Sequence, residues 1–132
     1  MSKATPGWRF SVDVGGTFTD CVARTPAQEL RTLKVLSSSR LKGRVAAGAA
    51  GLLCDESLCG LCDDFLRGFE LRLLGPAGVV LERAAVTGSR SADGAVLTAR
   101  PLDKLAAAGS WELASPEEAP LLCMRMLSLI HI

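Results

Sequence analysis

The residues best suited to chemistry lie in one short segment near the amino terminus, DVGGTFTD at residues 13–20. An acid is followed by two glycines and then by two threonine hydroxyls two residues apart. Amides of a glycine turn can point into the bend and bind an anion, and side chains two apart on an extended chain face one side. The segment therefore predicts a phosphate-binding hairpin with four contacting residues, Gly15, Gly16, Thr17 and Thr19.

Two carboxylates flank the glycine turn. A carboxylate would repel a phosphate directly, so Asp13 is predicted to act through Mg²⁺ or on an attacking water, as the catalytic residue. Asp20 is placed with the cofactor-binding residues, with capping of the turn as its alternative role. The spacing differs from the two glycine patterns that lead into helices, Gly-x-x-x-x-Gly-Lys-Ser/Thr and Gly-x-Gly-x-x-Gly. A plain Gly-Gly hairpin turn with surface threonines is the alternative to a phosphate site.

The elements around this segment are predicted from apolar and polar patterning. Residues 9–14, 17–24 and 30–36 alternate, which predicts an antiparallel meander of three short strands. Other patterns predict a helix over 41–54, a hairpin of 69–74 and 79–87, a strand over 95–97 and a last helix opened by a capping box at 115–118. The fold class is α+β, a mostly antiparallel sheet with packed helices.

Composition excludes several classes of function. The chain has 132 residues, which suits one domain, and 48% hydrophobic with 22% charged residues argues against disorder. A formal charge of +1, with no Tyr and few other aromatic residues, gives no basis for nucleic acid or an anionic membrane as a partner. No apolar signal region or membrane-length run is present. We therefore expect a cytoplasmic protein whose five cysteines are thiols.

Three of the cysteines, Cys54, Cys59 and Cys62, lie close together in the sequence. Cys59-x-x-Cys62 has the spacing of metal ligands, but a single such pair is a weak signal. Buried or incidental thiols are the favoured interpretation, and no metal ligand is assigned among the cysteines.

The carboxyl end has an unusual sequence. Residues 127–132, LSLIHI, are also the translation of the mosaic end of a transposase library adaptor. We expect these six residues to be a sequencing-adaptor artefact and the native sequence to have been cut near Met126. His131, the sole histidine, would then be foreign, and the chain would have no histidine-based catalysis of its own.

Residues 9–38 closely resemble the amino-terminal region of the hydantoinase A/5-oxoprolinase family, through FSVDVGGTFTDCVA at 10–23 and LKVLSS at 33–38. These enzymes look like members of the ATPase group that holds actin, sugar kinases and heat-shock chaperones, whose first phosphate loop is the same hairpin. Residues 112–120 resemble a helix that precedes a later Gly-Thr-Thr segment in some of these proteins. The resemblance implies an incomplete ribonuclease-H-like ATPase lobe, with residues 1–126 as a partial amino-terminal domain.

The resemblance also implies an activity, the ATP-dependent opening of a cyclic amide such as 5-oxoproline or a hydantoin. The ring amide oxygen would be phosphorylated before water opens the ring. Gly15 and Gly16 would supply backbone donors to a phosphate, Thr17 and Thr19 hydroxyl contacts, and Asp13 would lie near Mg²⁺. The partner would be the rest of the chain or a hydantoinase B-type subunit, and the isolated fragment would be inactive because nucleotide binding in this superfamily needs a second lobe.

Two other functions stay open. The first is a subunit fragment of an ATP-dependent ketone carboxylase, whose family shares the same amino-terminal motif. Val14 bears on the substrate within the resembled family, because 5-oxoprolinases often carry Arg at the matching place, whereas Val is common there in the hydantoinase A branch. The second is a non-catalytic interaction domain, complete as given, which would fold cooperatively as a monodisperse protein.

The adaptor hypothesis predicts the outcome of sequencing the source DNA with long reads across codons 120–132. We expect the reading frame to continue beyond Met126 into a Gly-Thr-rich loop and several hundred further codons. A true stop codon after Ile132 would contradict the hypothesis and make His131 a native residue.

Overall fold

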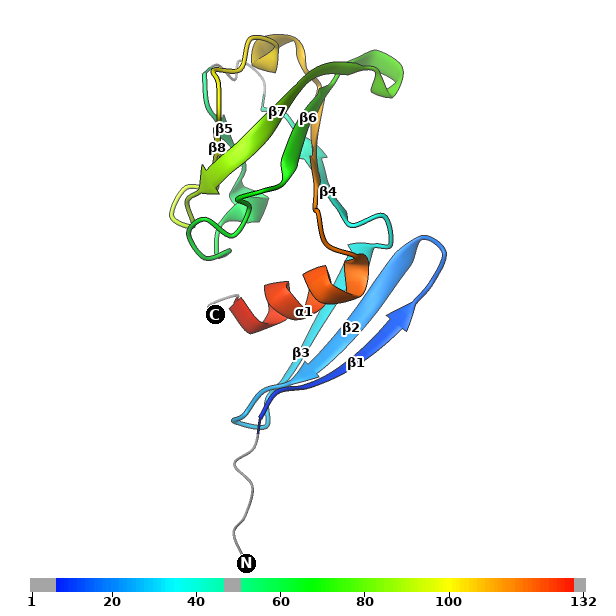
Figure 1. Cartoon of the computed structure of the whole chain (residues 1–132). Helices are drawn as coiled ribbons and strands as arrows, with labels where there is room; N and C mark the ends of the chain where they lie inside the picture. Colours follow the sequence, from blue (N-terminus) through cyan, green and yellow to red (C-terminus); the bar gives the residue numbers. More distant parts are fainter. Residues whose placement is uncertain (1–6, 47–50, 130–132) are drawn as a thin grey trace, which may run out of the picture. The chain divides into compact units, whose positions relative to one another are not determined.

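The computed structural model describes residues 7–46 and 51–129 (Figure 1). They divide into two compact units. The first holds residues 7–39 and 117–129, and the second holds the described residues between Arg40 and Pro116. The second unit is thus an insertion in the chain between the last strand and the helix of the first.

The first unit is a three-stranded antiparallel sheet with one helix packed on it (Figure 1). Its elements are β1 (Arg9–Val14), β2 (Phe18–Arg24), β3 (Leu30–Leu36) and α1 (Ala119–Leu129). The predicted meander is confirmed, in the order β1-β2-β3. The mostly antiparallel α+β class is confirmed as well.

The two faces of this sheet differ because side chains alternate along β2. Thr19, Cys21 and Ala23 are buried, whereas the residues between them are exposed. α1 contacts β2 and β3, and its inward residues complete the core: Ala119, Leu122, Cys123, Met126 and Leu127. The sheet therefore has one covered face and one face open to solvent.

The second unit contains a six-stranded antiparallel sheet in the order β4-β9-β6-β7-β8-β5. Its strands are β4 (Arg40–Arg44), β5 (Leu53–Cys54), β6 (Glu70–Leu74), β7 (Val80–Ser89), β8 (Ala95–Thr98) and β9 (Ser110–Ala114). Single turns of 3-10 helix lie at η1 (Glu56–Leu58), η2 (Pro76–Gly78) and η3 (Leu105–Ala107). The predicted hairpin is confirmed as β6 and β7, and the predicted strand over 95–97 as β8.

Apolar side chains of β6 and β9 form the centre of the second core. Leu71, Leu73, Trp111 and Leu113 are each at most 1% exposed. The ring N–H of Trp111 donates to a carboxylate oxygen of Asp55 at 2.7 Å. Burial raises the pKa of Asp55, but hydrogen bonds from its neighbours outweigh burial and hold that pKa below its usual value. The indole N–H is thereby satisfied inside the core.

The helix predicted over 41–54 is wrong where the structure describes that segment. Arg40–Arg44 is β4 and pairs with β9, and β5 begins at Leu53; residues 47–50 lie outside the described residues. The apolar spacing suits a helix, but Gly43 lies opposite Trp111 in the sheet. The missing side chain leaves room for the indole, an advantage that only the strand pairing uses.

β9 is absent from the sequence-based expectations, and the helical resemblance over 112–120 is wrong for its first residues. Glu112 and Leu113 belong to β9, which pairs with both β4 and β6. The last helix also begins later than the capping box predicts, at Ala119, and its first turn closes with a hydrogen bond from Leu122 N–H to the Glu118 carbonyl at 3.0 Å. Pro120 then lies in the first turn, where a missing N–H leaves no carbonyl unpaired.

Gly43→Ala should destabilise the second unit. A Cβ at this position would lie 2.4–2.7 Å from atoms of the Trp111 ring, so the indole must shift. We expect a loss of about 1–3 kcal/mol in the free energy of unfolding, measured by urea titration with tryptophan fluorescence. Gly109→Ala is the control, because nothing lies within 4 Å of its added Cβ. Equal stability of the two variants would contradict the packing described here.

Candidate functional site

The turn between β1 and β2 is formed by two residues, Gly16 and Thr17. Gly15 N–H donates to the Phe18 carbonyl at 2.9 Å and closes the turn. The two glycines of the motif therefore have different tasks. Gly15 belongs to the hydrogen-bonded ladder, and Gly16 stands at the exposed tip.

Close approach of the backbone, and not a left-handed conformation, requires Gly15. Neither Gly15 nor Gly16 has a φ in the left-handed region. A Cβ on Gly15 would lie 2.9 Å from the Phe18 carbonyl oxygen, whereas the space around Gly16 is open. The expected nest of two glycine amides is corrected accordingly, because the Gly15 N–H is already used inside the hairpin.

Ser37, just beyond the end of β3, holds this turn with both its backbone and its side chain. Its N–H donates to the Thr17 carbonyl at 2.9 Å, and its hydroxyl donates to the Gly15 carbonyl at 2.7 Å. The same hydroxyl lies 2.9 Å from that of Thr19. Since the single Ser37 hydroxyl proton goes to Gly15, Thr19 is the donor in that contact.

The two threonines do not share an accessible face, contrary to the expectation from their spacing. Thr17 is exposed in the turn, whereas Thr19 is fully buried in β2. The strand begins only at Phe18, so its alternation does not extend back to Thr17. Thr19 stabilises the turn through its hydrogen bond with Ser37. Ser37 itself is missing from the site residues predicted from the sequence. Within the described residues, neither the Gly16 N–H nor the Thr17 hydroxyl takes part in a hydrogen bond.

Asp13 and Asp20 lie opposite each other on the solvent-facing side of the sheet. Side chains at such positions have Cβ atoms about 5 Å apart, so the two carboxylates are neighbours. Lys34 on β3 stands opposite Asp20, with Nζ 3.8 Å from Asp20 Oδ1 and 5.3 Å from the centre of the Phe18 ring. The row crosses all three strands and carries two exposed negative charges and one positive charge.

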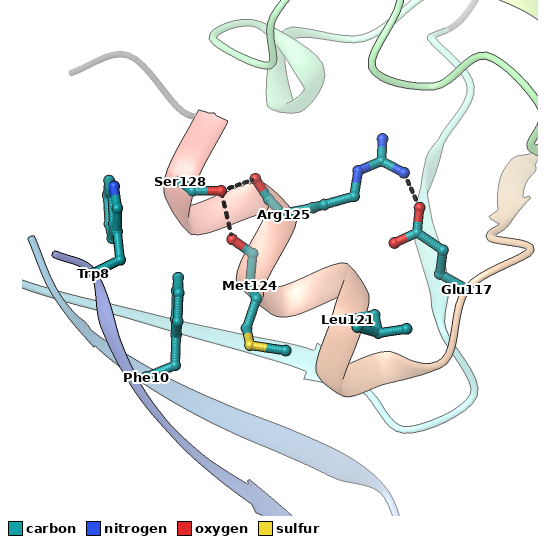
Figure 2. Close-up of a pocket in the computed structure, with 7 residues that line it drawn as sticks. All are labelled: Trp8, Phe10, Glu117, Leu121, Met124, Arg125 and Ser128. Carbon is teal, nitrogen blue, oxygen red and sulfur yellow. Dashed lines mark hydrogen bonds and ion pairs between the residues drawn. The ribbon is translucent and has the colours of Figure 1, made fainter.

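Two depressions mark the surface of this unit. One of about 500 Å³ runs over β2 and β3 and is lined by Asp20, Cys21, Val22, Thr32, Leu33 and Lys34. The other, of about 370 Å³, lies between β1 and α1 and is lined by Trp8, Phe10, Glu117, Leu121, Met124, Arg125 and Ser128. Figure 2 shows the stacked rings of Trp8 and Phe10, whose centroids are 5.8 Å apart, on its strand side. Only the first depression includes a predicted site residue, Asp20.

The cysteines do not form a metal centre in the part of the chain that the structure describes. No group of three or more His, Cys, Asp or Glu side chains there is placed to hold a metal ion. Cys59 instead donates its thiol to the Ala92 carbonyl at 3.8 Å. Burial, together with the neighbouring Cys21, raises the pKa of Cys123 to about 11, which favours the unreactive thiol.

A comparison with protein families finds one match. Residues 9–57 match the family model described as the hydantoinase/oxoprolinase N-terminal region. The description of the matched family names hydrolase-type enzymes. The resemblance to the hydantoinase/oxoprolinase family is confirmed over these residues, which include β1, β2, β3 and β4. No curated protein and no solved structure matches the chain.

Among residues 7–46 and 51–129, no helix is long and apolar enough to cross a membrane.

Ser37→Ala should loosen the turn. The substitution removes the hydrogen bond to the Gly15 carbonyl and leaves the buried Thr19 hydroxyl without an acceptor. We expect a loss of about 1–3 kcal/mol in stability, seen as faster amide hydrogen exchange at Gly15 and Thr19. Ser37→Thr, which keeps a hydroxyl, should restore most protection, and Ser38→Ala, at an exposed position, is the matched control. Unchanged exchange in Ser37→Ala would contradict the network.

Proposed function

We propose that this chain is the amino-terminal part of an ATP-dependent enzyme that opens a cyclic amide of the 5-oxoproline or hydantoin class. The observation that carries the proposal is the match of residues 9–57 to the hydantoinase/oxoprolinase N-terminal region. That stretch contains the whole turn, both carboxylates and Ser37. The geometry of the turn supports the proposal, which gives each residue of the turn a task.

The tip of the turn is the proposed phosphate contact. Phosphate oxygens accept hydrogen bonds, and the tip exposes two donors that the fold does not use, the Gly16 N–H and the Thr17 hydroxyl. The sequence predicts that Gly15 and Thr19 contact the cofactor. In this proposal they act indirectly, by holding the residues that contact it. Their hydrogen bonds, together with those of Ser37, fix the tip in one conformation before a ligand arrives.

The residues present fit Mg²⁺ as the accompanying ion. Magnesium in nucleotide sites is held by one or two carboxylates, with phosphate oxygens and water as the other ligands. Asp13 and Asp20 supply two carboxylates at opposed positions, three residues before Gly16 and three residues after Thr17. Lys34, 3.8 Å from Asp20, partly neutralises that carboxylate. Asp13, for which no ion pair is seen in the described residues, is therefore the stronger candidate ligand.

In the proposed reaction, the terminal phosphoryl group of ATP would pass to the ring amide oxygen and ADP would leave. Water would add to the activated ring carbon, the ring C–N bond would break with the nitrogen taking up a proton, and a second water would release the phosphate from the ring-opened acyl phosphate. Bound Mg²⁺ supplies positive charge against the phosphate oxygens. The chain's own part is to hold the phosphate at Gly16 and Thr17 and to orient the ion and nearby water through Asp13. The ring itself would be bound by residues outside the hairpin.

The 132-residue chain alone should neither hydrolyse ATP nor open 5-oxoproline. One turn presents few donors, and the resemblance implies that nucleotide binding also needs a second lobe and a second phosphate loop. The measurement is phosphate release and ring opening with purified chain and Mg²⁺-ATP. Turnover that disappears on Asp13→Ala would contradict the expectation of an inactive fragment.

In the complete reading frame, Asp13→Asn should lower amide-dependent ATP hydrolysis by at least about 100-fold, the effect typical of losing one preorganised electrostatic contact. Asp103→Asn, at an exposed position of the second unit, is the matched control and should stay within about twofold. The panel of substrates is 5-oxoproline, hydantoin, and acetone with bicarbonate. Activity with acetone and bicarbonate but with neither cyclic amide would favour the ketone carboxylase over the amide hydrolase. Wild-type rates of ATP hydrolysis in Asp13→Asn would overturn the role of Asp13.

A further inference from the structure

A group of charged side chains crosses four strands of the second unit. Lys42 on β4 stands opposite Glu112 on β9, Glu112 opposite Arg72 on β6, and Arg72 opposite Arg83 on β7. Arg40 lies two residues before Lys42 on β4 and therefore on the same face. We call Arg40, Lys42, Arg72 and Arg83 the basic face.

A buried carboxylate holds three of these cations in place. The side chain of Glu112 is only 7% exposed. Its oxygens lie 3.4 Å from Arg40 Nη1, 3.4 Å from Lys42 Nζ and 3.7 Å from Arg72 Nη1. One cation is enough to neutralise the buried carboxylate of Glu112. The other two cations around it are therefore not needed to balance its charge. The arrangement fixes the cations in position instead of leaving them free in solvent.

The basic face carries surplus positive charge at accessible positions. Glu70 is the one further acid of the group, with Arg72 Nε 2.6 Å from its Oε1. Four cations against two carboxylates leave a charge of +2, although the whole chain carries only +1. The side chains of Arg40 and Lys42 are 40% and 56% exposed, and Arg83 is exposed as well.

The chemistry of this face favours protein carboxylates over nucleic acid. Single-stranded nucleic acid is bound by aromatic stacking beside a continuous basic groove. The only aromatic residue in β4, β6, β7 and β9 is Trp111, which is buried on the other side of the sheet. Arginine can pair with the planar fork of a carboxylate through two parallel hydrogen bonds, which needs no stacking partner.

We propose that the basic face binds an acidic protein segment through paired carboxylates. A depression of about 330 Å³ adjoins Arg83 and gives a side chain of that segment a place to lie; it is lined by Gly68, Phe69, Glu70, Arg83, Ala84 and Ala85. Charges on alternate residues of β4 are about 7 Å apart, the spacing of alternate side chains in an extended peptide. This proposal does not rest on the proposed enzyme activity.

The test uses the 132-residue chain and fluorescent poly-L-glutamate of about 20 residues as the probe, followed by anisotropy at low salt. The double variant Lys42→Ser/Arg83→Ser should weaken binding about fivefold to tenfold and flatten its dependence on salt. Lys104→Ser/Arg9→Ser removes the same two charges from exposed positions elsewhere and should change affinity less than about twofold. Glu70→Gln, which adds net positive charge without removing a cation, should strengthen binding.

Three outcomes would overturn the proposal. The first is an absence of poly-L-glutamate binding at 20 mM salt, where the screening length is about 20 Å. The second is an equal loss of affinity in the two double variants. The third is tighter binding of a poly-uridylate probe of the same length than of poly-L-glutamate. The proposal predicts that Glu70→Gln binds poly-L-glutamate more tightly. A folding defect would weaken binding, so it cannot produce this supporting result. Loss of ATP hydrolysis in the complete enzyme would leave this binding experiment unaffected.

Discussion

The hydroxyl of Ser37 joins the end of β3 to the turn between β1 and β2, and the hairpin depends on this contact. Antiparallel pairing alone fixes Gly15 against Phe18 but leaves a two-residue tip without further restraint. Ser37 adds hydrogen bonds to the Gly15 and Thr17 carbonyls and accepts one from buried Thr19. The Gly15 and Thr17 carbonyls are thus occupied from within, whereas the exposed Gly16 amide and Thr17 hydroxyl make no hydrogen bond within the described residues.

The same register that buries Thr19 brings two carboxylates together on the opposite face. Asp13 and Asp20 are direct cross-strand partners, an arrangement that costs stability because like charges repel. Lys34 offsets one charge, at 3.8 Å from Asp20. A fold that needed only a stable hairpin would gain by separating these acids. In the nucleotide site that we propose, a cation shared with a phosphate would offset the repulsion between the two acids.

Local patterning was sufficient to predict the elements whose contacts are near in sequence. β1, β2 and β3 pair with their neighbours through short turns, as do β6 and β7. β4 pairs instead with β9, far along the chain, where Gly43 leaves room for Trp111 and neighbouring cations meet Glu112. The site follows the same division. The motif residues could be predicted, but the use of the Thr19 hydroxyl inside the fold could not, because it depends on Ser37, eighteen residues away. The Gly15 N–H is taken by the Phe18 carbonyl within the hairpin itself.

The insertion of the second unit between β3 and α1 explains how one chain can carry two separate surfaces. α1 must return to β2 and β3 after the whole insertion, yet each doubling of a loop adds only about 0.6 kcal/mol of closure entropy. The insertion has a core of its own around Leu71 and Trp111. Once it is folded, the flexible part of the connection between β3 and α1 is shorter than the number of inserted residues suggests. Residues of the insertion are therefore free to vary without disturbing the turn, whose supports all come from residues 15–37. The basic face around Glu112 can therefore bind a partner, as we propose, without changing the hydrogen bonds of the β1–β2 hairpin.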